Sequence, residues 1–132
     1  LLPRMKHMMD LTRQHGSFVF VHSDGAVRDI LPDLLDIGMQ VLNPIQWRCP
    51  GMDRKGLKQD FGDKLIFHGG MDNQQTLPFG NVRDVRREVE ENLAILGAGG
   101  GYILAPCHNI QPVTPPENIA ALYETGYELG WI

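Results

Sequence analysis

The sequence predicts an α/β protein built on a parallel sheet. Short apolar runs typical of buried strands alternate with segments of helical periodicity, in the order of one helix and then four strand–helix units. Each apolar run also passes into polar residues at its carboxyl end, which is where parallel α/β folds bind their ligands. An open doubly wound sheet and part of a closed barrel both satisfy this pattern.

The first half of the chain supplies two helices and two strands. Residues 3–15 have apolar side chains at helical spacing. Residues 17–21, SFVFV, form the first expected strand, because a continuous β-branched and aromatic run is typical of strands buried on both faces. A helix over 27–37 follows, with Pro32 in its first turn or at a kink. MQVLN, residues 39–43, is the second expected strand.

The second half repeats the alternation. We expect, in order, a short helix around 53–61, a strand at 64–70, a helix over 82–96, a strand at 102–105 and a helix ending near residue 130. Asn81 is placed to cap the helix that begins at residue 82. Thr114 and Glu117 have the spacing of a capping box, which predicts the start of the last helix.

Composition narrows the class of protein. The chain has 132 residues, of which 42% are hydrophobic and 21% charged, as expected for a single soluble domain over residues 1–132. The formal net charge of −4 argues against a nucleic-acid surface, and no apolar run is long enough for a membrane-spanning helix. The two cysteines form no disulfide framework, which predicts a cytoplasmic protein.

Polar residues at the expected strand ends are the candidate site. They follow the strands in this order: His22, Ser23 and Asp24; Asn43, Gln46, Trp47, Arg48 and Cys49; His68, Gly69, Gly70 and Asp72; Cys107, His108 and Asn109. Because parallel strands end at the same edge of a sheet, these side chains are expected to meet there.

His22 and Asp24 lie two residues apart, so on a strand their side chains point the same way. They predict either a metal-ligand pair or an oriented acid–base pair. The alternative is that Asp24 caps the next helix and His22 bonds internally. With Cys107 or His108 as a third ligand, the pair would leave an open zinc position, as catalytic zinc sites do. Cys107 is equally interpreted as a buried structural residue.

HGGMD after the third strand has two glycines where backbone can approach a ligand. Asp72 is then a candidate catalytic residue, with turn capping as the alternative. His68 and Gly70 are candidate substrate contacts.

Four segments carry a resemblance to a known family: HSDGAVRDILPDLLDIG, VLNPIQ, LKQDFGDKLIFHGGMD and GGGYILAPCHNIQPVTPPENI. In order, they resemble the carboxyl-terminal half of the uroporphyrinogen decarboxylase superfamily, which includes decarboxylases and methyltransferases acting between corrinoids and thiols. The resemblance implies half of a (β/α)8 TIM barrel, with about four parallel strands each followed by a helix.

The resemblance also implies roles for individual residues. In the decarboxylase branch a Gly-His-Gly motif closes the last strand; here His108 takes the histidine position, while Cys107 and Asn109 replace the glycines. In the methyltransferase branch zinc is held by a His-x-Cys pair and a later cysteine. His22 matches the first ligand, Asp24 replaces the second, and the third falls at Cys107 or His108.

Together these interpretations give three sets of expected site residues. The expected catalytic residues are His22, Asp24, His108 and Asp72. The expected substrate contacts are Asn43, Gln46, Arg48, His68, Gly70 and Asn109. The expected zinc ligands, if zinc is bound, are His22, Asp24, His108 and Cys107.

The implied function is that of a decarboxylase acting on tetrapyrrole carboxylates without a cofactor. The alternatives are a zinc-dependent methyltransferase and a non-catalytic half-barrel. The arginines and the aspartate that bind substrate in the decarboxylases lie in the amino-terminal half, which this chain does not contain. Four barrel strands alone would leave open edges, so we expect a second half-barrel as partner, either another copy in a homodimer or an amino-terminal segment.

Overall fold

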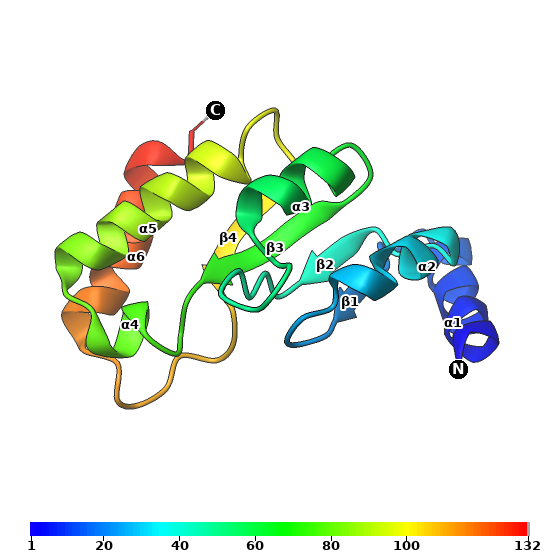
Figure 1. Ribbon diagram of the computed structural model, residues 1–132, viewed down its shortest axis with the longest axis horizontal. Helices are drawn as coiled ribbons and strands as arrows, with labels where there is room; N and C mark the ends of the chain where they lie inside the picture. Colours follow the sequence, from blue (N-terminus) through cyan, green and yellow to red (C-terminus); the bar gives the residue numbers. More distant parts are fainter. Residues whose placement is uncertain (132) are drawn as a thin grey trace.

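A parallel four-stranded sheet organises the chain (Figure 1). The structure is a computed structural model that describes residues 1–131, so the last residue of the expected 1–132 domain lies outside it. The strands are β1 (Phe20–His22), β2 (Val41–Asn43), β3 (Ile66–Met71) and β4 (Tyr102–Pro106). They are hydrogen-bonded in the order β1-β2-β3-β4, with every neighbouring pair parallel. The predicted parallel sheet is confirmed.

Helices precede and follow the strands as expected. They are α1 (Leu2–Gln14), the 3-10 turn η1 (Arg28–Ile30), α2 (Leu31–Asp36), α3 (Arg54–Phe61), α4 (Thr76–Phe79), α5 (Val82–Ile95) and α6 (Pro116–Leu129). Figure 1 shows α1 and α2 at one end of the molecule and α4, α5 and α6 at the other. Among residues 1–131 no helix combines the length and the hydrophobicity that a membrane crossing requires.

Three elements differ from the sequence prediction. The first expected strand, 17–21, is found as β1 at Phe20–His22, and its exposed Phe20 contradicts the expected burial on both faces. The helix expected over 27–37 is divided into η1 and α2, and Pro32 lies in the first turn of α2, where its missing N–H costs no helical hydrogen bond. The one-turn helix α4 was not predicted, because four residues are too few to show a helical period.

The helix caps confirm one prediction and correct another. Asn81 accepts hydrogen bonds from the backbone of Arg83 and Asp84, and the Asp84 side chain accepts from Asn81 in return, so α5 has a full capping box. Thr114 does not cap α6, which contradicts the predicted capping box. Because Pro116 forces Pro115 into an extended conformation (φ −59°, ψ 135°), the helix begins at Pro116 and leaves Thr114 outside it.

The parallel register gives the sheet two unlike faces. Leu42, Phe67 and Tyr102 are in register and lie on the face that packs against α2 and α3, where Leu31 and Leu57 are fully buried. Side chains at the alternate positions point to the opposite face. There Phe20 is 50% exposed and Ile103 is 47% exposed, so this inner face lacks a cover within residues 1–131.

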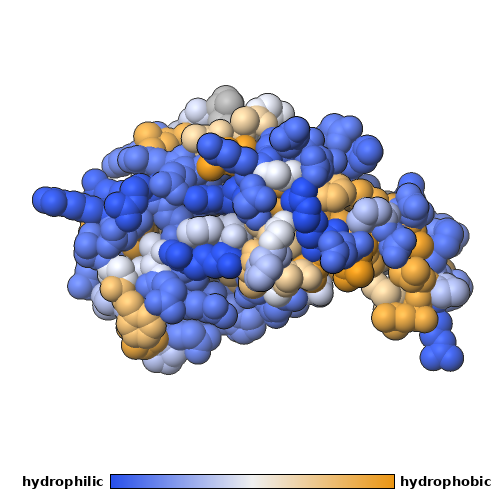
Figure 2. All heavy atoms as spheres, viewed as in Figure 1, coloured by the Kyte–Doolittle hydropathy of each residue, from blue (hydrophilic) through white to orange (hydrophobic). Residues whose placement is uncertain are grey.

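Hydrophobic side chains are also exposed at the ends of the sheet. Figure 2 shows them, in orange, near the α1 end of the molecule. Those exposed on or near α1 and β1 are Leu1, Leu2, Met8, Leu11, Phe18 and Phe20. Those on β4 and in or beyond α6 are Ile103, Tyr123, Tyr127, Leu129 and Trp131. Exposed apolar patches of this kind mark surfaces that associate.

Gly70 is a position where the fold requires glycine. Its φ is +92°, and a Cβ there would lie 2.9 Å from the Tyr102 hydroxyl, which donates to the Gly69 carbonyl. We predict that Gly70→Ala lowers the free energy of unfolding by about 3 kcal/mol or more, through strain and collision together. Gly99→Ala is the matched control, since Gly99 also has positive φ but open space around it. It should cost about 1 kcal/mol. Urea denaturation measures both, and equal losses would contradict the collision.

Candidate functional site

A groove opens on the inner face at the carboxyl ends of the strands. Its volume is about 410 Å³. The polar side chains that line it are His22, Asn43, His68, His108, Asn109 and Tyr123. The structure therefore brings together predicted site residues from every strand of the sheet. Tyr123, which reaches the groove from α6, was not predicted, because nothing local distinguishes it from other exposed helix residues.

Asn43 links two imidazoles across neighbouring strands. Its Oδ1 lies 2.6 Å from His22 Nδ1, and its Nδ2 lies 2.8 Å from His68 Nδ1. In this orientation the amide oxygen accepts a hydrogen bond from His22 Nδ1–H, and the amide nitrogen donates one to His68 Nδ1. His68 is therefore neutral, with its proton on Nε2. The asparagine fixes the tautomer of both rings.

His68 resists protonation for a second reason. Partial burial lowers the pKa of His68 below its usual value, and a hydrogen bond to its own backbone opposes that shift only in part. The Phe20 ring stands edge-on to the imidazole with centroids 5.1 Å apart, which adds an apolar neighbour. At neutral pH the imidazole of His68 is uncharged.

His22 occupies the most open part of the cluster. Its Nε2 lies 3.4 Å from Asp24 Oδ2, and both side chains are 50% exposed. The predicted same-side placement of this pair is observed, and Asp24 makes no cap bond to η1, so the capping alternative is not realised. His108 lies beyond, with its ring centroid 6.3 Å from that of His22.

The described residues do not assemble the predicted zinc set. Within residues 1–131 no group of three or more His, Cys, Asp or Glu side chains is close enough to hold a metal ion. Cys107 is turned away: its side chain is buried and its thiol donates to the Ile45 carbonyl at 3.3 Å. Burial raises the pKa of the Cys107 thiol to about 12, which opposes the thiolate that a zinc ligand requires. His22, Asp24, His108 and Cys107 therefore do not fit zinc.

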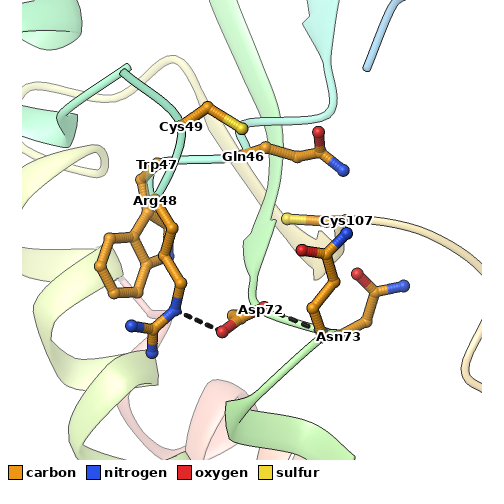
Figure 3. Close-up of a pocket in the computed structure, with 8 residues that line it drawn as sticks. Gln46, Trp47, Arg48, Cys49, Asp72, Asn73 and Cys107 are labelled. Atoms are coloured by element: carbon orange, nitrogen blue, oxygen red, sulfur yellow. Dashed lines mark hydrogen bonds and ion pairs between the residues drawn. The ribbon is translucent and has the colours of Figure 1, made fainter. Parts of the chain in front are cut away.

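Asp72 and Arg48 lie outside the groove in a separate cluster (Figure 3). They form an ion pair, and with Gln46, Cys49 and Cys107 they line a small cavity of about 20 Å³. The Asp72 carboxylate also accepts from the backbone of the following turn, so the capping alternative for Asp72 is realised. Asp72 is 7% exposed, which places it poorly for contact with a substrate.

Gln46 and Gly70 serve the framework of the site. The Gln46 Oε1 accepts from the Gly25 backbone at 2.6 Å and so holds the loop after β1 against the loop after β2. The Gly70 carbonyl accepts from the Trp47 indole and from the Asn92 amide. These predicted substrate contacts are thus engaged in holding the loops around the groove.

Sequence reasoning missed the residues beneath the strand ends. Glu88 and Asn92 on α5 are buried, at 5% and 0% exposed. Glu88 bonds to the loops that follow β2 and β3, and Asn92 bonds to Arg54 of α3 and to the Gly70 carbonyl of β3. The sequence does indicate that they are buried, because both fall on the same helical face as Val85 and Val89. Polar residues on a buried face are expected to have partners.

The chain is similar to proteins of one family. Residues 1–129 match the family model for uroporphyrinogen decarboxylase (URO-D). The uroporphyrinogen decarboxylase of Ectopseudomonas mendocina (strain ymp) is 29% identical over 134 residues, covering 97% of this chain and 35% of that protein. That of Legionella pneumophila (strain Corby) is 34% identical over 85 residues, covering 64% of this chain and 23% of that protein.

A solved structure has the same fold. A methyltransferase from Methanosarcina mazei superposes with a TM-score of 0.77 at 27% identity, over 99% of this chain and 36% of its own. The predicted half of a (β/α)8 barrel is confirmed by the parallel strand order and by this likeness. The chain spans about a quarter to about a third of the length of the relatives it matches.

We predict that His68 makes stability depend on pH. Because its folded pKa is lowered, the unfolded chain binds the proton more tightly, so stability falls as pH drops through about 6.5. His68→Gln removes this contribution and should flatten the fall between about pH 7.5 and pH 5. His15→Gln, at an exposed position after α1, is the control. Urea midpoints across this range measure the effect, and an unchanged slope in His68→Gln would contradict it.

Proposed function

The chain belongs to the uroporphyrinogen decarboxylase family, and we propose that its inner face forms one wall of a decarboxylase site for tetrapyrrole carboxylates. One observation carries the proposal: the His22–Asn43–His68 chain opens into the groove, with Asp24 beside His22. The names of the curated relatives supply the substrate class.

The proposed chemistry needs a proton and no electron carrier. Loss of carbon dioxide leaves the bonding electron pair on the side-chain carbon of the substrate, and a proton must replace the carboxyl group there. His22 is the proposed proton relay: because Asn43 holds its Nδ1–H, its Nε2 takes up a proton from solvent and passes that proton to the side-chain carbon of the substrate. The Asp24 carboxylate, 3.4 Å from Nε2, is proposed to hold the ring in this position.

Other groove residues are proposed to recognise the substrate. The Asn109 amide and the His108 ring lie at the rim, where they can donate to the substrate's carboxylates. Neutral His68 offers its Nε2–H to the same face. Arg48 is 49% exposed and lies at the neighbouring cluster, so it is proposed to contact a carboxylate that extends beyond the groove.

Methyl transfer is the second candidate, because the superposed Methanosarcina mazei structure is a methyltransferase. In the zinc-dependent form of that reaction, the metal would activate a thiol. The described residues of this chain do not fit such a zinc site, since Cys107 is a buried hydrogen-bond donor. The imidazole and amide groups of the inner face favour proton transfer instead.

A complete barrel requires a partner for both edges of the sheet, and we propose a second copy of this chain. The β1 edge lies beside α1, which carries Arg4, Lys6 and Arg13 against one acid, Asp10. The β4 edge lies beside α6, which carries Glu117, Glu124 and Glu128 and no Lys or Arg. Pairing β4 of one copy with β1 of the next brings opposite charges together at both junctions of a two-fold assembly.

We predict that the protein removes carboxylates from uroporphyrinogen and that His22→Gln slows this by about 100-fold or more, the usual contribution of a positioned proton donor. The products are separated by their number of carboxylates after oxidation to porphyrins. His15→Gln, at an exposed position after α1, is the control and should keep full activity.

Assays on the same purified proteins decide between the candidate functions. Transfer of a methyl group from methylcobalamin to a thiol, without carboxylate loss, would replace the decarboxylase proposal with the second candidate. An assembled protein that performs neither reaction would favour a non-catalytic half-barrel.

We predict a two-chain assembly that weakens as salt rises, because opposite charges on α1 and α6 steer it. Native mass spectrometry and sedimentation should both report it. Arg4→Glu should dissociate the assembly, and mixing it with Glu124→Lys should restore a mixed dimer. Arg83→Glu, on the exposed side of α5, is the control. A single-chain species at every concentration would contradict the second copy as partner.

A further inference from the structure

Glu88 is a buried carboxylate that contacts the loops after β2 and β3. It lies on the buried face of α5 and is 5% exposed. Its Oε1 accepts from the Asp72 backbone N–H at 2.6 Å and from the Trp47 indole at 3.4 Å. Asp72 follows β3 and Trp47 follows β2, so one side chain joins segments from two neighbouring strands.

Trp47 is held between two guanidinium groups. Arg48 and Arg54 each lie 4.3 Å from the centre of its ring, and the indole N–H is shared between Glu88 and the Gly70 carbonyl. Stacking of this kind fixes the plane of the ring. Arg54 is itself anchored to Asn92 and Glu91 on α5. These contacts restrain the orientation of the indole.

Arg48 completes the connection to the surface. Its Nε donates to the Asp72 carboxylate and its Nη2 donates to the Thr76 hydroxyl. The backbone of the same Asp72 donates to Glu88. Glu88 therefore restrains Arg48 by two routes. It holds Trp47, whose ring contacts the Arg48 guanidinium, and it holds the backbone of Asp72, whose carboxylate accepts from Arg48.

We propose that Glu88 is a positioning residue, whose buried carboxylate fixes Trp47 and Asp72 and thereby orients the Arg48 guanidinium toward a carboxylate of the substrate. The ligand part of this inference rests on the proposed function. The positioning part rests only on contacts within the chain.

Charged and titratable groups from several elements surround Glu88. Asp72 donates its backbone N–H to Glu88 and forms an ion pair with Arg48. Arg54 of α3 contacts the Trp47 ring. Tyr102 on β4 and Cys107 directly after β4 are also neighbours of Glu88. Burial raises the pKa of Glu88, while hydrogen bonds from Thr76, Asp72 and Trp47 oppose the shift. Both Tyr102 and Cys107 have raised pKa values and stay neutral through the range in which Glu88 titrates.

The Trp47 indole N–H reports on Glu88 without any ligand. In a Trp131→Phe background, its proton resonance should move downfield as pH rises through the pKa of Glu88, because a carboxylate is the stronger acceptor. Glu88→Gln should abolish this titration, and the matched exposed variant Glu90→Gln should preserve it. A titration that survives in Glu88→Gln, or no titration in the parent chain, would overturn the positioning role.

Binding of uroporphyrin tests the link to Arg48. Glu88→Leu should raise the Kd about tenfold, whereas Glu88→Gln, which keeps an acceptor oxygen, should restore most of the affinity. In an Arg48→Ala background, Glu88→Leu should cause little further loss, because both changes remove the same contact. Additive losses would overturn the link. If the parent chain binds no uroporphyrin, the proposed function fails, and the indole titration still decides whether Glu88 positions the loops.

Discussion

The parallel register of the four strands is the constraint on which the remaining structure depends. It aligns side chains of the same parity across the sheet, so that Leu42 and Phe67 meet the helices while Asn43 and His68 meet the open face. A shift of one residue in β1 or β3 would place an imidazole among the core leucines. The apolar core and the polar groove are thus two results of one alignment.

Much of this arrangement could be predicted from the sequence because it follows from local pattern. Apolar runs located the strands, and the Asn81 cap located α5, since both depend on neighbouring residues alone. Polar residues at strand ends predicted the site for the same reason. The cap at Thr114 was wrong because adjacent prolines overrode the side-chain spacing. The pairing of Asn43 with both imidazoles could not be predicted, because it depends on the register between strands.

The buried polar contacts between α5 and the loops after β2 and β3 were the hardest part of the structure to predict from the sequence. A charged residue such as Glu88 is normally expected on the solvated face of a helix, where it needs no protein partner. It is buried here because backbone and indole N–H groups replace the water it loses, and those donors come from segments far away in the sequence. Two unlike polar clusters therefore adjoin one sheet. The inner face is built from imidazoles and amides, while the loops rely on arginine, carboxylate and an aromatic ring.

This division of chemistry also separates the candidate reactions. Methyl transfer to a thiol requires a cation that stabilises the thiolate of the substrate, yet Cys107, a candidate ligand for such a cation, is buried against a backbone carbonyl and keeps its proton. Decarboxylation requires anchors for carboxylates and one mobile proton. In the proposed function, His22, whose tautomer Asn43 fixes, delivers the proton, and Arg48 in the loop after β2 supplies a fixed guanidinium. A substrate with several carboxylates could span both clusters, and a small thiol could not.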